Sequence, residues 1–203
     1  RFGNAAWKAF DYPTSETGAQ NGLLVGIAYQ NFDISTQSGT PSIEYGNANA
    51  FESNGWTVDA SWRGDGWNVF GYYVTTEGKN LARTLEQKSD GWLIQGGFML
   101  NDNLELFGQY QNGNIAGATW TNGSNDLDAF RVGFNYWPVA GSNNVKWTTD
   151  IGWAGESLAA GGATTSTSGI ASADWEGTGN GWRGDTGTND GQMLLRTQLQ
   201  LLF

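Results

Sequence analysis

The amino-acid sequence predicts an all-β fold, an antiparallel up-and-down transmembrane β-barrel with eight or nine strands in this chain. Three observations support this prediction. Apolar and polar residues alternate with a period of two along most of the chain, and helical periodicity is almost absent. The aromatic residues, which include 11 Trp, gather near the ends of the alternating segments, as amphipathic rings do at a water–lipid boundary. Short and long links alternate between these segments, which is typical of a meander whose two ends face different compartments.

The alternation defines eight strands and one further candidate. In the segment 56–63, for example, every second residue is apolar, and the residues between them are Thr, Asp, Ser and Arg. The same pattern predicts strands at 22–32, 55–63, 66–77, 91–100, 103–112, 127–138, 144–154 and 191–203. The stretch Phe2–Phe10, followed by the polar link Asp11–Asn21, would be a ninth strand.

The predicted links differ in length and composition. Short links are expected at 64–66, 101–102 and 138–143, and long ones at 33–54, 78–90, 113–126 and 155–190. All the long links would therefore lie at one end of the sheet. The stretch 159–190 is the richest in Gly, Ser and Thr, and it would form a surface loop that either stays outside or folds inward. Because a strand follows it, residues 1–203 are expected to form a single domain.

Composition excludes several classes of function. The 203 residues contain no Cys and no His, so disulfides, zinc fingers, haem ligands and Ser-His-Asp triads are excluded. The net charge of −10 argues against nucleic acid as a partner. The longest apolar runs are a few residues, far short of the roughly 20 that a spanning helix requires. No cofactor is expected.

The polar face of the alternation supplies the candidate functional residues. In a barrel this face would line the lumen, and the apolar face would contact lipid. The predicted pore-lining residues are Asp59, Arg63, Glu105, Gln109, Arg131, Lys146, Asp150 and Arg196. The predicted lipid-facing residues are Val58, Ala60, Phe130, Val132, Phe134, Ile151, Leu199 and Leu201. The lumen charges are of both signs, so they would either create a transverse field across a pore or pair across strands and hydrate its wall.

The C-terminal half resembles a known family. The chain ends in the alternating segment Leu195–Phe203, which resembles the last strand of bacterial outer-membrane barrels, with Phe203 as the aromatic residue that the barrel assembly machinery reads. The segments 103–110, 130–137 and 145–153 resemble porin strands. Their order before this ending is similar to that in the phosphate-selective porin O and P family.

This resemblance implies a barrel of about sixteen strands, often a homotrimer, through which small hydrophilic solutes and ions cross the outer membrane of Gram-negative bacteria. Members of the family are longer, so this chain would be the C-terminal portion of such a barrel. Their anion selectivity depends on a run of basic residues along the pore, and no such run is present in this sequence. The acidic residues of the long links instead favour a weak preference for cations, because a negative mouth concentrates them nearby.

Two other hypotheses are compatible with the same pattern. Eight strands would suffice for a small closed barrel with a structural or adhesive role. A secreted β-sandwich would use exposed Trp rings to bind carbohydrate. An enzyme is not expected, because glycoside hydrolysis needs two facing carboxylates and only Glu105 is a Glu well inside a predicted strand.

Overall fold

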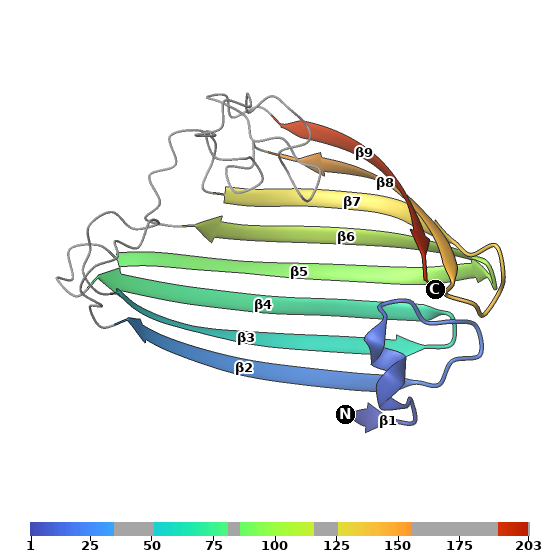
Figure 1. Cartoon of the computed structure of the whole chain (residues 1–203), viewed down its shortest axis with the longest axis horizontal. Helices are drawn as coiled ribbons and strands as arrows, with labels where there is room; N and C mark the ends of the chain where they lie inside the picture. The colour runs from blue at the N-terminus through green and yellow to red at the C-terminus, as the bar shows by residue number, and fades with distance from the viewer. Residues whose placement is uncertain (35–50, 81–85, 116–125, 156–190, 203) are drawn as a thin grey trace.

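The computed structural model describes residues 1–34, 51–80, 86–115, 126–155 and 191–202. Its elements are, in chain order, β1 (Phe2–Gly3), the 3-10 helix η1 (Trp7–Asp11), β2 (Gly22–Ile34), β3 (Phe51–Gly64), β4 (Trp67–Asn80), β5 (Glu86–Asn101), β6 (Leu104–Ile115), β7 (Asp126–Tyr136), β8 (Val145–Ala154) and β9 (Gln192–Leu201). These nine strands form one antiparallel sheet in which each strand pairs with its neighbours in sequence (Figure 1). The prediction of an all-β, up-and-down antiparallel fold is therefore confirmed.

Each of the eight predicted strands is present, but most extend further than predicted toward the end where the long links join them. β5, for example, begins at Glu86 rather than at 91. These extensions carry charged residues that interrupt the alternation. Lys79 of β4 forms ion pairs with Glu77 and, at 3.7 Å, with Glu86 of β5. The backbones of β4 and β5 continue to pair there, although the side chains no longer form an apolar face. The link predicted at 78–90 is therefore shortened to 81–85.

The predicted strand at Phe2–Phe10 is wrong. Only the first two residues of that stretch pair with β2. The chain then forms η1, beginning with a hydrogen bond of 3.0 Å from the Ala9 N–H to the Ala6 carbonyl. Trp7 and Phe10 lie three residues apart, which fits one turn of a 3-10 helix and does not fit the two-residue period of a strand.

The sheet is open in the part of the chain that the structure describes. β9 pairs with β8 alone, and β1 and β2 have no pairing with β9. The strands thus form neither a closed eight-stranded barrel nor the two packed sheets of a sandwich. No helix among the described residues has the length and apolar character needed to cross a membrane.

The register of the strands divides the side chains between two faces. Residues paired directly across neighbouring strands lie on the same face. One such row runs from β3 to β9 through Arg63, Asn68, Gly97, Phe107, Gly133, Asp150 and Arg196. All eight residues that the sequence predicts to line a pore share this face, which we call the inner face. The eight residues predicted to face lipid share the opposite, outer face.

Two bands of large side chains cross the outer face. The loop-side band lies nearer to the strand ends joined by the long links, and it consists of Tyr29, Trp56, Tyr73, Trp92, Tyr110, Phe130, Trp153 and Met193. The turn-side band consists of Leu23, Trp62, Trp67, Phe98, Leu104, Tyr136, Trp147 and Leu199. On every strand from β2 to β9 the two band positions are six residues apart, or about 20 Å along the strand.

The bands run obliquely to the rows of paired residues. Both shift by two residues toward the short links between β3 and β4, and again between β5 and β6. Ring contacts bridge the shifts in the loop-side band: Trp56 and Tyr73 have ring centres 5.2 Å apart, and so do those of Trp92 and Tyr110. Because the two bands shift together, the outer face between them keeps a constant height from β2 to β9.

The outer face between the bands carries no charged residue on the described strands. Its positions are Val25, Ile27, Val58, Ala60, Val69, Gly71, Ile94, Gly96, Leu106, Gly108, Val132, Phe134, Thr149, Ile151, Leu195 and Thr197. The hydroxyls of Thr149 and Thr197 lie 3.1 Å apart, and the indole N–H of Trp147 donates to Thr197 Oγ1 at 2.7 Å. The polar atoms of this zone are therefore paired within the sheet.

Burial in this sheet is the reverse of that in a water-soluble protein. On the outer face Ile27 is 79% exposed and Leu195 is 72% exposed. On the inner face Arg63, Glu105 and Asp150 are only 5%, 3% and 1% exposed. Soluble proteins bury apolar side chains and leave charges in water. The outer face is therefore complementary to an apolar surrounding.

Gly133 and Gly108 provide a matched pair for testing the register. A Cβ on Gly133 would overlap the Thr149 carbonyl and Asp150, whereas one on Gly108 would stay 3.9 Å or more from neighbouring strands. We expect Gly133→Ala to lower the thermal unfolding midpoint. Gly108→Ala should leave the midpoint unchanged or raise it slightly, because Ala loses less conformational entropy than Gly in a strand. Circular dichroism of the purified variants would measure both, and equal midpoints would contradict the β7–β8 register.

Candidate functional site

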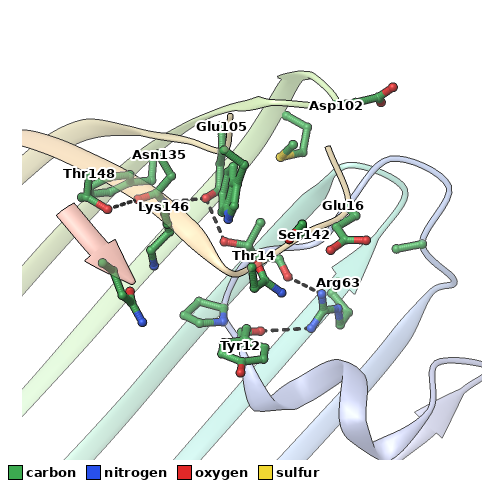
Figure 2. Close-up of a pocket in the computed structure, with 18 of the residues that line it drawn as sticks. Tyr12, Thr14, Glu16, Arg63, Asp102, Glu105, Asn135, Ser142, Lys146 and Thr148 are labelled. Atoms are coloured by element: carbon green, nitrogen blue, oxygen red, sulfur yellow. Dashed lines mark hydrogen bonds between the residues drawn. The ribbon is translucent and has the colours of Figure 1, made fainter. Parts of the chain in front are cut away.

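The link between β1 and β2, residues 4–21, lies against the inner face near the strand ends joined by the short links (Figure 1). We call it the N-terminal segment. A cavity of about 490 Å³ lies between this segment, the inner face and the loop 137–144. Figure 2 shows side chains from the N-terminal segment, from β3 and from β6, β7 and β8 directed toward this cavity.

Arg63 connects the N-terminal segment to β3. Its guanidinium donates to the backbone carbonyl of Tyr12 at 3.1 Å and to that of Thr14 (Figure 2). The guanidinium carbon also lies 5.7 Å from the centre of the Phe10 ring, within the range of a cation–π interaction. A buried guanidinium keeps its charge, so the two carbonyls and the ring replace part of its hydration.

Glu105 on β6 is the second anchor of the segment. Its carboxylate accepts hydrogen bonds from Thr14 Oγ1 at 3.0 Å, Asn68 Nδ2 at 2.9 Å and Asn135 Nδ2 at 2.7 Å. The carboxylate lies against Gly97, where any Cβ would overlap it. These donors stabilise a charge that has almost no contact with solvent.

Further hydrogen bonds attach the segment to the turn between β3 and β4. Ser15 is fully buried, and its hydroxyl donates to the Gly64 carbonyl at 2.5 Å. The Gly18 N–H donates to the Asp65 carboxylate at 2.5 Å. The middle of the segment is thus held by bonds to β3, to the following turn and to β6.

A second ionic cluster lies on β7, β8 and β9. The Asp150 carboxylate, which has no exposed surface, accepts hydrogen bonds from Arg131 at 2.8 and 3.1 Å and from Arg196 Nε at 3.0 Å. The Cα and Cβ of Asp150 lie beside Gly133, where an added Cβ would overlap both atoms. Because one carboxylate is shared by two guanidiniums, the cluster carries a net positive charge, and Arg196 is its more exposed member.

The structure brings most of the predicted pore-lining residues together. Arg63, Glu105, Gln109, Lys146 and Arg196 line the cavity. Beside the cavity, Asp150 pairs with both Arg131 and Arg196. Asp59 lies on the same face of β3, further toward the long links, and does not line the cavity.

Sequence analysis missed the neutral partners of these charges. Asn68 and Asn135 hold Glu105, and Thr148 Oγ1 donates to Asn135 at 2.6 Å. Asn135 and Thr148 lie on the polar face of predicted strands, so their alternation pattern could have indicated that they are near the predicted charges. Thr14 lies in a link without periodicity, so nothing in the sequence indicated its role.

The cavity is lined by charges of both signs, as predicted for the inner face. Basic residues at the cavity are Lys8, Arg63, Lys146 and Arg196, and acidic residues are Glu16, Asp102 and Glu105. Arg63 and Glu105 are occupied by internal hydrogen bonds, and Arg196 is bonded to Asp150 but remains partly exposed. A solute would therefore meet the exposed part of Arg196 and the remaining charges of the cavity. The acidic side chains among the described residues form no group of three that could hold a metal ion.

No protein-family model and no curated protein matches this sequence. The functional argument therefore rests on the two faces of the sheet and on the cavity. Those are physical properties of this chain, and each can be tested directly.

Asp150→Asn and Asp59→Asn form a matched pair of acidic substitutions on the inner face. We expect Asp150→Asn to lower the free energy of unfolding by about 1–3 kcal/mol, because two guanidiniums then lose their shared carboxylate. Asp59 has no ion pair among the described residues, so Asp59→Asn should change it by less than about 0.5 kcal/mol. Denaturant unfolding would measure both values. If Asp150→Asn lowered the free energy of unfolding by no more than about 0.5 kcal/mol, as expected for Asp59→Asn, the cluster around Asp150 would add no stability.

Proposed function

We propose that this chain forms part of the wall of an outer-membrane porin, through which small hydrophilic solutes and ions diffuse passively. One observation carries the proposal: a single-layer sheet has an uncharged, exposed outer face between two bands of mostly aromatic residues and a polar inner face with buried charges. Strands that alternate between a lipid face and a lumen face are the pattern of transmembrane barrels. In this role the chain acts without catalysis and without a cofactor.

The two bands support a position in a lipid bilayer. Trp and Tyr favour the boundary between hydrocarbon and water, because their rings are apolar and their N–H and O–H groups are polar. The bands are about 20 Å apart along the strands. At the usual tilt of barrel strands this is about 15 Å along the membrane normal, which is shorter than the roughly 25 Å apolar band of outer-membrane barrels. The joint shift of both bands agrees with strands that cross a membrane at a tilt.

The open edges of the sheet favour a barrel larger than the described strands. An unpaired strand edge inside a bilayer is costly, because its N–H and C=O groups find no water there. Further strands must therefore pair with the free edges at β2 and β9 for the sheet to be stable in lipid. We propose a barrel of about sixteen strands that assembles as a homotrimer, because the C-terminal strands resemble those of porins of that size.

Three parts of this proposal concern residues that lie wholly or partly outside the described ranges. Phe203 would be read by the barrel assembly machinery. The link 156–190 would face the outside or fold into the lumen. Acidic residues in the long links would give the pore a weak preference for cations.

The proposed function is tested by extraction, gel mobility and conductance. The native protein should leave the cell envelope only with detergent, shift its gel mobility on boiling, and form ion-conducting channels in planar bilayers. Solubility without detergent and no shift on boiling would contradict the membrane location. A shift on boiling without conductance would contradict the porin function alone.

Arginine substitutions on the outer face should have effects that depend on depth. Val132 lies between the bands on β7, two residues from the loop-side band and four from the turn-side band. Leu195 on β9 lies in the same row, since Ile151 pairs with both residues. We expect Val132→Arg and Leu195→Arg to destabilise the membrane-inserted state by about 2–4 kcal/mol. Leu199 belongs to the turn-side band, so Leu199→Arg should cost only about 0–1 kcal/mol. Folding yields into lipid vesicles would rank the three variants, and equal yields would contradict the assigned depth.

A further inference from the structure

The N-terminal segment takes a longer path than its position in the sheet requires. It joins β1 to β2, which are adjacent antiparallel strands. Two residues are enough for such a connection, as Asp65 and Gly66 show between β3 and β4. Residues 4–21 instead extend over the inner face, and their contacts reach β6.

The N-terminal segment extends over a large part of the inner face, from β2 to β6. Thr14 is bonded to Arg63 on β3 and to Glu105 on β6. From β2, where the segment rejoins the sheet, to β6 is four strand spacings, or about 19 Å along the sheet. A segment that crosses this distance at one end of a barrel occupies space that would otherwise be lumen.

The segment is tightly fixed at several points along its length. Ala5 is 3% exposed and Ser15 is fully buried. Gly22 of β2 makes room for its start, since a Cβ there would overlap Ala5 and approach the Phe10 ring to 3.0 Å. Arg63 and Glu105 then hold its middle from two different strands.

We propose that the N-terminal segment is a fixed constriction at the short-link end of the pore, with Arg63 and Glu105 as its positioning residues. This inference rests on the proposed porin function. Solutes would pass through the space that the segment leaves open, the cavity of about 490 Å³. Its opposite wall is formed by Lys146 on β8 and by Arg196, Gln198 and Gln200 on β9. The segment would therefore set the largest solute that the pore admits.

The test compares channels of the natural full chain with two variants that release or remove the segment. In Arg63→Gln the segment loses its guanidinium anchor, and in the second variant a short Gly–Ser linker replaces residues 6–19. We expect both to raise single-channel conductance and the size of the largest polyethylene glycol that enters, with a roughly twofold rise in conductance for the linker variant. Lys88→Gln is the control, because Lys88 is an exposed basic residue on β5 at the opposite end of the sheet.

A labelling experiment keeps the proposal testable if either variant fails to fold. The chain has no Cys, so Thr14→Cys introduces a single thiol into the segment. Charged thiol reagents should change the conductance of open Thr14→Cys channels, with opposite effects on cation preference for positive and negative reagents. Ile27→Cys, on the outer face, should be unaffected.

The outcomes separate this inference from the proposed function. If wild-type channels form but neither the linker variant nor labelling at Thr14 alters conductance or the size limit, the segment is not a constriction and the porin function stands. If the wild-type protein inserts into bilayers and conducts no ions, the porin function fails, and the constriction fails with it.

Discussion

A single-layer sheet has no second layer against which to bury a face, and the other features of this protein depend on that constraint. Each face must match its own surroundings. The outer face meets the constraint with uncharged residues whose few hydroxyls bond to one another, such as Thr149 and Thr197. The inner face meets it with buried charges, such as Glu105 and Asp150, that are held by hydrogen bonds or ion pairs. Neither arrangement would be stable if the two faces were exchanged.

The inner face combines structural charges with accessible ones. Arg63, Glu105 and Asp150 are held by several partners each, so their main effect is to fix the N-terminal segment and the last three strands. Lys146 and Arg196 lie on the far wall of the cavity, where a solute would encounter them. In the proposed porin, the shape of the passage and its electrostatics would thus depend on different residues.

The strands and their faces could be predicted from the sequence, because in a one-layer sheet a side chain's face depends only on whether its position is odd or even. This is why Glu105 and Asp150 were placed on the correct face without any knowledge of their partners. The same reasoning failed at Phe2–Phe10, where two aromatic residues suggested a strand and the chain forms η1. Strand ends were also underestimated, because backbone pairing continues past the last alternating residue.

The sequence by itself determined that the chain is all-β, that the strands follow one another as a meander, and which side chains share a face. It could do so because these properties are local and periodic. Only the tertiary structure decided that residues 4–21 turn onto the inner face, that Asp150 is shared by Arg131 and Arg196, and that Glu105 anchors Thr14. These contacts join residues far apart in the chain and depend on the register of neighbouring strands and on room left by Gly97 and Gly133. No periodic pattern records them, because each depends on side-chain geometry in three dimensions.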